Sequence, residues 1–367
     1  MKCGTLEKDS RRRTRSERRG NLMDIFRSVI ENYEGHVVTK IRLVNDSGAE
    51  ISCFTMGATW NEFLVPSEDG DKQNILLGFD TARQYYENSL CCCQSIGRVA
   101  GRIKDGQFEI DGKKYQVPTN ENGNTLHGGP QGYRFLNWGY TTSRGTNSVS
   151  VLFQKHIKET RDGFPGNYLA TVVYTLDNNN KVTISYSALN GEHDTLFNPT
   201  CHTYFNLSDK RDLSTHSLMI NSHEYLETDD ETIPTGRVLQ VDDTPYDFRK
   251  FKNLKEADDE NGGFDDAFVV NGPGMATKPT AVLRDNESRR QVTIESEGTG
   301  LVMYTMPEID SGIKLSRDGG MDALPGEGVA LEAQQLPDAI NHENFGDVVL
   351  KRNEKKTYHI SFAFEQK

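Results

Sequence analysis

Residues 168–187 read YLATVVYTLDNNNKVTISYS, and this stretch decides the fold class. In its closing part, KVTISYS, the apolar residues Val182, Ile184 and Tyr186 alternate with hydroxyl-bearing residues, which is the period of two of a β-strand with one buried face. The polar run DNNN at 177–180 is typical of a turn. The stretch therefore predicts a β-hairpin.

The same alternation recurs along the chain, and helical periodicity is scarce. In residues 358–365 (YHISFAFE) every second residue is aromatic or Ile, and shorter β-branched runs stand at 37–44, 50–54, 149–153 and 292–294. The acidic segment 256–263 ends in two glycines, so we expect a surface loop there. Strands that follow one another without intervening helices predict an all-β fold, a large antiparallel β-sandwich.

Residues 1–22 differ in composition from the rest of the chain. They hold eight Lys or Arg against three acidic residues. We expect a disordered tail, and a tag for nucleic acid or an anionic surface is the alternative. A further hypothesis is that these residues are not natural protein, because Arg18-Arg19 can be encoded by AGGAGG, a bacterial ribosome-binding sequence, just before Met23. Residues 23–367 are expected to form one domain.

Charge and composition exclude several classes of partner. The net charge is −12 although the leader is basic, so the remaining chain repels polyphosphate, and we expect no nucleic-acid partner. No apolar run reaches the roughly 18 to 20 residues of a membrane helix, and no signal peptide is recognisable, so we expect a cytoplasmic protein without a membrane partner. The six cysteines form no CxxC pair, which favours reduced, buried thiols. Monomer and homodimer both stay open.

Four segments place ionisable side chains beside small or turn-forming residues: 97–103 (GRVAGRI), 124–129 (NTLHGG), 198–207 (NPTCHTYFNL) and 328–334 (GVALEAQ). Taken singly, each has an ordinary structural interpretation. Glu332 is the exception, because a buried strand favours an apolar residue at its position, and a carboxylate there needs water or partners.

The sequence lacks the residue patterns that a thiol nucleophile, a metal site or a phosphate-binding loop would need. Cys201 and His202 are consecutive on a strand and project to opposite faces, so they do not form a thiol–base pair. No HxxxH or HxH pair and no phosphate-binding GxxxxGK[ST] loop is present, so we expect no metal and no cofactor.

In their order along the chain, these segments resemble the aldose 1-epimerase (galactose mutarotase) family. The matching segments are 77–80 (LGFD), the segment around Arg102, 124–129 (NTLHGG), 162–166 (DGFPG), 198–207 (NPTCHTYFNL), 263–265 (GFD) and 331–334 (LEAQ). The resemblance covers nearly the whole chain from Met23 onward. It implies a galactose mutarotase-like β-supersandwich with a sugar site in a groove across one sheet.

The resemblance also implies the roles of five residues. His202 is the general acid and Glu332 the general base, while Arg102, His127 and Asp265 bind the substrate. The implied reaction interconverts the α and β anomers of a free aldohexose, galactose or glucose, with a reducing disaccharide such as maltose as a further substrate. It belongs to the isomerases and to hexose metabolism.

This reaction needs one base and one acid beside the anomeric carbon. The base removes the proton from O1 and the acid protonates the ring oxygen O5, so that the C1–O5 bond breaks and recloses on the other aldehyde face. We expect Glu332 to be ionised and its charge to raise the pKa of His202. Trp138 or Tyr204 is expected to pack on the apolar face of the sugar.

Three departures from the family pattern bear on substrate preference. Gly101 stands where many members have Asn, and Val302 where some have Gln. Asp266 stands where His usually follows the binding aspartate, which leaves the choice between Asp265 and Asp266 open. Two other functions stay open: a phosphosugar epimerase, which would need more cations than Arg98 and Arg102, and a noncatalytic carbohydrate-binding module.

Overall fold

The computed structural model describes residues 23–67, 70–271 and 279–367. Residues 1–22 lie outside these ranges, so the expectations for the basic leader stay predictions. The organisation of residues 23–367 as one domain likewise stays a prediction.

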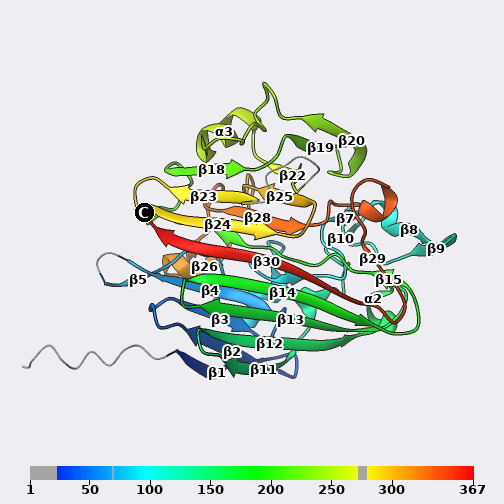
Figure 1. Cartoon of the computed structure of the whole chain (residues 1–367), viewed down its shortest axis with the longest axis horizontal. Helices are drawn as coiled ribbons and strands as arrows, with labels where there is room; N and C mark the ends of the chain where they lie inside the picture. The colour runs from blue at the N-terminus through cyan, green and yellow to red at the C-terminus, as the bar shows by residue number, and fades with distance from the viewer. Residues whose placement is uncertain (1–22, 68–69, 272–278) are drawn as a thin grey trace, which may run out of the picture.

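A nine-stranded antiparallel sheet forms one layer of the molecule, and its strands cross Figure 1 one above another. The predicted hairpin is confirmed as its centre, since residues 168–176 pair with 182–190 in register. The sheet order is β11 (Gly139–Arg144), β12 (Ser148–Ile157), β13 (Tyr168–Asp177), β14 (Lys181–Asn190), β30 (Lys355–Gln366), β24 (Arg290–Ser296), β23 (Ala281–Asp285), β18 (His216–Ile220) and β21 (Lys252–Asn253).

Two further antiparallel sheets together form the second layer. Leu76 bridges to Phe205, and the Leu77 amide donates to the Tyr204 carbonyl at 3.0 Å, which joins the two sheets edge to edge. The first has the order β1 (Asp24–Tyr33), β2 (His36–Val44), β3 (Glu50–Phe54), β4 (Thr59–Pro66) and β5 (Lys72–Asn74). The second has the order β17 (Tyr204–Phe205), β28 (Val329–Gln334), β25 (Gly300–Tyr304), β22 (Asp265–Val269), β19 (Glu224–Thr228) and β20 (Pro234–Gln240).

Aromatic side chains from both layers meet in the core between them. The Trp60 ring of β4 is fully buried and lies 5.3 Å from Phe362 on β30 and 6.3 Å from Tyr174 on β13. Phe205 of β17 also contacts Phe362, at 5.7 Å. Burying such rings is the largest single source of hydrophobic stabilisation in a core. The predicted all-β antiparallel sandwich is therefore confirmed.

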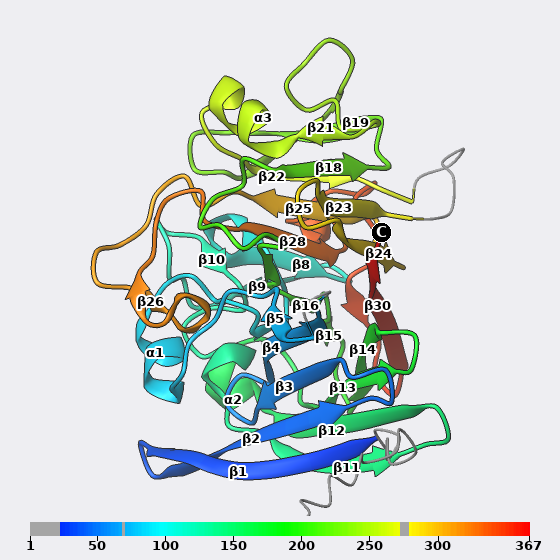
Figure 2. The same ribbon diagram turned by 90° about the vertical axis from the view of Figure 1, so that its left-hand side faces the viewer.

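Short two-stranded sheets, helices and 3₁₀ turns lie outside the three large sheets. The small two-stranded sheets pair β6 (Ser95–Ile96) with β16 (Thr200–Cys201), β7 (Arg102–Ile103) with β10 (Thr125–Leu126), β8 (Gln107–Ile110) with β9 (Lys113–Gln116), β15 (Thr195–Leu196) with β29 (Val349–Leu350), and β26 (Lys314–Leu315) with β27 (Met321–Asp322). The helices are α1 (Ala82–Glu87), α2 (Glu159–Asp162) and α3 (Leu254–Asn261), with 3₁₀ turns at Lys104–Gly106, Tyr133–Phe135, Ser316–Asp318 and Ala339–Asn341. In both views α3 lies at one end of the molecule, and β1 and β11 lie at the other (Figures 1 and 2).

The surface loop predicted for residues 256–263 is wrong, because most of this segment belongs to α3. The Asn253 side chain caps the helix by accepting from the Glu256 amide at 3.0 Å. Leu254 and Ala257, spaced by three residues, are buried beneath it, and Gly262 ends it in the left-handed conformation. Reading the segment by its acidic composition missed this cap and this spacing.

The cysteine prediction is confirmed for the described residues. Cys53, Cys91, Cys92, Cys93 and Cys201 are buried and free, while Cys3 lies outside the described ranges. Among the helices of the described residues, none is long and apolar enough to cross a membrane.

Candidate active site

A pocket of about 290 Å³ lies over the six-stranded sheet, on the face turned away from the core. Successive strand residues point to opposite faces, so Leu331 and Met303 pack into the core while Glu332 and Val302 face the pocket. The lining residues are Ser89, Leu90, Gly101, Arg102, Glu121, Leu126, His127, His202, Tyr204, Thr228, Thr232, Pro234, Asp265, Ala267, Val302, Tyr304, Glu332, Gln334 and Pro337. All five residues predicted for the site are among them.

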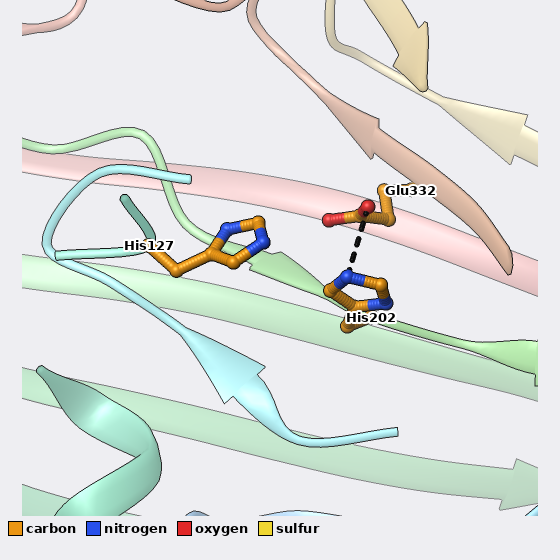
Figure 3. Close-up of side chains that lie close together, drawn as sticks. All are labelled: His127, His202 and Glu332. Carbon is orange, nitrogen blue, oxygen red and sulfur yellow. Dashed lines mark ion pairs between the residues drawn. The ribbon is translucent and has the colours of Figure 1, made fainter. Parts of the chain in front are cut away.

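His202 and Glu332 meet at the floor of this pocket (Figure 3). The His202 Nε2 atom lies 3.3 Å from Glu332 Oε1, and the two side chains are only 8% and 3% exposed. The second oxygen, Glu332 Oε2, and the second nitrogen, His202 Nδ1, have no partner in the described protein. Two polar groups are thus withdrawn from bulk water but retain unused hydrogen-bonding capacity beside an open cavity.

Backbone contacts fix the separation of this pair. The Leu331 amide donates to the Thr203 carbonyl at 3.0 Å, and the Thr203 hydroxyl donates back to the Leu331 carbonyl at 2.7 Å. The His202 amide also donates to the Gln94 carbonyl at 3.1 Å. The segment that carries His202 is therefore tied to strand β28, which carries Glu332, through Thr203 and Leu331, the residues next to the pair in the sequence.

Burial dominates the protonation of both groups. Burial raises the pKa of Glu332 well above its usual range, the Asp265 charge adds to this, and Arg102 opposes it. Burial lowers the pKa of His202 to about 3. The expectation that an ionised Glu332 would raise the pKa of His202 is wrong, because burial disfavours both the carboxylate and the imidazolium. The pair therefore favours its neutral form, in which one proton lies on the carboxyl group.

The His127 side chain extends toward the pair from a separate segment of the chain (Figure 3). Its ring lies edge-on to His202, with 5.1 Å between centroids. The Gly101 amide donates to His127 Nδ1 at 3.2 Å, and burial next to His202 and Arg102 keeps the pKa of His127 well below its usual value. A neutral ring whose Nδ1 accepts a hydrogen bond carries its proton on Nε2. His127 therefore offers a donor to the pocket.

Arg102 is held by an acidic neighbour that the sequence did not indicate. Its Nε and Nη2 atoms donate to the two carboxylate oxygens of Glu121 at 2.6 and 2.9 Å. The remaining nitrogen, Nη1, lies 3.6 Å from Asp265 Oδ2. This two-point contact orients the guanidinium plane and leaves Nη1 directed toward the predicted binding aspartate.

The register of β22 decides between the two candidate aspartates. Asp265 pairs with Tyr304 across the sheet and lines the pocket, whereas Asp266 projects to the other face, beside Tyr246. Among the described lining residues Asp265 is present and Asp266 is not.

The two aromatic candidates differ in position. Tyr204 lines the pocket, and its ring stacks on His202 at 5.0 Å with an interplanar angle of 8°. Trp138 is 2% exposed and packs edge-on against Tyr133 in the core. The alternative that Trp138 contacts the sugar is therefore wrong.

Arg98 does not serve the pocket with Arg102. Its side chain is fully buried and binds Asp162 with two nitrogens, Nε to Oδ2 at 2.7 Å and Nη2 to Oδ1 at 3.0 Å. The Nη1 atom donates to the Pro165 carbonyl and to the Thr195 hydroxyl. This arginine joins three segments of the fold.

Three potential metal ligands come together although the sequence spacing showed no metal motif. One donor atom each from His127, His202 and Glu332 lies within 4.8 Å of the others. Two imidazoles and a carboxylate are a ligand set that Zn²⁺ accepts. An ion held there would occupy both His202 and Glu332 and remove them from acid–base work.

Sequence reasoning missed six polar pocket residues: Ser89, Glu121, Thr228, Thr232, Tyr304 and Gln334. Gln334 could have been found, since it stands two residues after Glu332 on the same strand and hence on the same face. Glu121 lies in a turn, and no local pattern signals its contact with Arg102.

Comparisons with known proteins agree with this geometry. The Aldose 1-epimerase family model matches residues 39–363. The chain is 46% identical to the aldose 1-epimerase of Streptococcus thermophilus, covering 93% of this chain and 99% of that one, and 36% identical to the maltose epimerase of Levilactobacillus brevis, covering 94% and 100%. The crystal structure of galactose 1-epimerase from Lactobacillus acidophilus superposes with a TM-score of 0.81 at 26% identity, covering 94% of this chain and 99% of that one. The chain therefore belongs to the aldose 1-epimerase family of isomerases, with the galactose mutarotase-like fold.

Proposed function

We propose that this chain interconverts the α and β anomers of a free aldohexose, galactose or glucose, with Glu332 as general base and His202 as general acid. The observation that carries the proposal is the contact of 3.3 Å between these two buried groups at the floor of a sugar-sized pocket. The base and the acid must reach O1 and O5 of one pyranose, which are bonded to the same carbon, so adjacent groups fit the task.

The assignment needs the pair in its carboxylate–imidazolium form, which differs from the neutral form by transfer of one proton from Glu332 to His202 across the 3.3 Å contact. Ring opening moves the O1 proton to Glu332 and a proton from His202 to O5, which leaves a neutral carboxyl group and a neutral imidazole. Burial favours this neutral form, since it raises the pKa of Glu332 and lowers that of His202. The pocket thus favours the state that follows ring opening over the charged pair that starts it, and reclosure on the other aldehyde face reverses both transfers.

The remaining predicted residues would hold the substrate. Arg102 Nη1, the Nε2 proton of His127 and the carboxylate of Asp265 offer two donors and one acceptor to ring hydroxyls. Tyr204 offers an aromatic face beside the acid. These contacts would orient O1 and O5 toward the pair.

A reducing disaccharide is a second candidate substrate. The observation that favours it is the sequence identity of 36% to a maltose epimerase over nearly the full length of both chains. The pocket also reaches the β19–β20 hairpin through Thr228, Thr232 and Pro234, which would border a second sugar unit.

A phosphosugar fits less well. Among the described lining residues Arg102 is the one Lys or Arg, and it shares the pocket with the carboxyl groups of Glu121, Asp265 and Glu332. Arg98, the other cation considered for such a substrate, is neutralised by Asp162 in the core. An anionic substrate would meet mostly acidic groups.

Polarimetry tests the proposal. Crystalline α-D-galactose, α-D-glucose and maltose are dissolved, and the relaxation of optical rotation is followed with wild type, Glu332→Gln and His202→Asn. We expect wild type to accelerate relaxation to the unchanged equilibrium, and each variant to lose about 10²- to 10⁴-fold in rate.

A matched control is available on the surface. His359 Nδ1 contacts Glu297 Oε2 at 3.0 Å in an exposed pair, so Glu297→Gln and His359→Asn repeat the same substitutions away from the pocket. These variants should keep wild-type rates. Spontaneous rates with wild type for all three sugars would refute the proposal.

A further inference from the structure

Gln334 is a fully buried amide that none of the proposed roles uses. Its exposed fraction is 0%, and neither Oε1 nor Nε2 has a hydrogen-bond partner in the described protein. A buried amide without partners is unfavourable, so natural proteins keep such groups only where something else completes their hydrogen bonds. The partner must therefore come from outside the described residues.

The strand geometry directs this amide to the sugar pocket. Gln334 stands two residues after Glu332 on β28, so both side chains lie on the same face, and both line the pocket. Across the sheet Gln334 pairs with Gly300, which has no side chain to contact the amide. The apolar side chain of Leu336 lies against Gly300, so this neighbouring strand supplies no polar partner to the amide.

The backbone on either side of Gln334 is held in place. The Thr200 hydroxyl donates to the Ala333 carbonyl at 2.8 Å, and the Gln335 amide donates to Asn198 Oδ1 at 2.9 Å. The position from which the amide projects is therefore fixed relative to Glu332. A fixed polar group near the reacting pair can distinguish hydroxyl positions, whereas a mobile one adapts to several.

The chemistry of the amide suits a sugar hydroxyl. A primary amide both donates and accepts, and a hydroxyl does the same, so one hydroxyl can pair with either end of the amide. Among the described lining residues Gln334 carries the one primary amide. The other unpartnered atoms of the pocket, on His202 and Glu332, are already assigned to proton transfer.

We propose that Gln334 binds one hydroxyl of the sugar and is a specificity-determining residue of this site. The inference rests on the proposed function, since it names a further contact to the same substrate. Removing the amide would leave that hydroxyl without its partner, and a sugar lacking the hydroxyl would leave the amide unpaired. Sites built in this way discriminate strongly against such analogues.

The test combines one variant with a panel of analogues. Gln334→Met keeps the length of the side chain and removes both hydrogen-bonding atoms. Mutarotation is measured for the preferred hexose and for its 2-, 3-, 4- and 6-deoxy analogues with wild type and variant. We expect the variant to raise KM for the parent sugar by about 5- to 20-fold and to change kcat by less than about twofold.

The decisive result is the pattern across the panel. For one deoxy sugar the ratio of variant to wild-type KM should fall to about 1, because the hydroxyl that Gln334 binds is missing there. A ratio near 1 for every sugar, or the same increased ratio for every sugar, would overturn the proposal. The second outcome would mean that Gln334 acts through packing of β28.

Two controls separate this inference from the function on which it rests. Gln291→Met replaces a buried glutamine of β24, which does not line the pocket, and should leave all ratios near 1. Calorimetric binding of the same sugars to Glu332→Gln, with and without Gln334→Met, reports the contact without any turnover. If wild type failed to accelerate mutarotation but bound sugars with the predicted deoxy pattern, the proposed function would fail and the Gln334 contact would stand.

Discussion

At the residue scale, the main feature is one proton shared between two buried groups. His202 and Glu332 are 3.3 Å apart, and burial makes the charged form of each unfavourable. For such a pair the macroscopic pKa values belong to the pair, and the reactive form is the one that carries a single proton. That proton lies on either partner without changing the overall charge.

This sharing predicts a wide pH range of activity. The reactive form is lost at low pH when His202 gains a second proton, and the pKa of His202 is lowered to about 3. It is lost at high pH when the single proton leaves, and the pKa of Glu332 is raised well above its usual range. We therefore expect kcat/KM not to fall as the pH rises through about 6.5, where an ordinary imidazolium loses its proton.

Initial rates of mutarotation across buffers of constant ionic strength measure this profile, after subtraction of the spontaneous rate at each pH. An ordinary imidazolium acting alone would lose activity above about pH 6.5. A decrease of kcat/KM with a midpoint near pH 6.5 would contradict the proposal that His202 and Glu332 share one proton.

Glu121 is predicted to be a positioning residue for Arg102. The two hydrogen bonds of 2.6 and 2.9 Å fix the guanidinium plane, and Glu121→Gln retains one acceptor but removes the charge. We expect KM to rise by about 5- to 10-fold with kcat within about threefold of wild type, because substrate binding is weakened and the acid–base pair is untouched.

The control for Glu121→Gln is Glu231→Gln. Glu231 accepts a hydrogen bond from Asn124 in the same region but does not line the pocket, and its variant should keep the wild-type KM. A fall in kcat of tenfold or more for Glu121→Gln would show that Glu121 takes part in the chemical step.

At the scale of single elements, strand alternation sorts core residues from pocket residues. On β28 the residues Leu331 and Ala333 face the core, while Glu332 and Gln334 face the pocket. A shift of one residue in this strand would bury the wrong set of side chains. The strand therefore specifies the core and the site together.

The same alternation on β22 gives a matched pair of variants. Asp265→Asn should raise KM by at least about tenfold, because a charged acceptor for sugar hydroxyls and for Arg102 is lost. Asp266→Asn changes a side chain on the opposite face and should leave KM within about twofold of wild type. Saturation curves give KM for the two variants. A larger increase of KM for Asp266→Asn than for Asp265→Asn would show that the register assigned to β22 is wrong.

Helix α3 shows that amino-acid composition alone does not predict whether a segment is a helix or a loop. The segment 256–263 is acidic and ends in glycines, which is typical of a loop, yet Asn253 caps a helix and Gly262 terminates it. Both glycines and acidic residues have a place at helix ends, so composition alone does not distinguish the two structures.

At the scale of the whole molecule, segments far apart in sequence are joined by a buried ion pair. Arg98 and Asp162 are 0% and 4% exposed, and Arg98 also binds Pro165 and Thr195. Arg98, Asp162 and Pro165 belong to segments that the family resemblance singled out, but the ion pair lies in the interior and stabilises the fold.

We expect Asp162→Ala to lower the free energy of unfolding by about 3 to 5 kcal/mol, because it leaves a buried guanidinium without its counter-charge. Urea denaturation followed by circular dichroism measures the loss. Below the unfolding transition KM should stay within about twofold of wild type, since neither residue lines the pocket.

The exposed pair of Arg144 and Asp24 is the matched control for this prediction. Its side chains are 48% and 50% exposed, so Asp24→Ala should cost less than about 1 kcal/mol. Equal losses for the two variants would mean that burial of the Arg98 pair adds nothing to its effect.

The sequence by itself determined the fold class and the chemical types in the site. The period of two in residues 168–187 and 358–365 follows from local backbone geometry and burial of one face, which any stretch of chain carries in its own residues. The order of the motifs indicated His202, Glu332, Arg102, His127 and Asp265, and all five line the pocket.

Only the tertiary structure decided how these groups act. Four features depend on strands and loops that are separated by many residues along the chain. They are the contact between His202 and Glu332, the hydrogen bonds between Arg102 and Glu121, the burial of Arg98 and the position of Gln334. The reversal of the expected pKa of His202 has the same origin. Removal of water is a property of the assembled pocket, and no local pattern records how much water a side chain will lose.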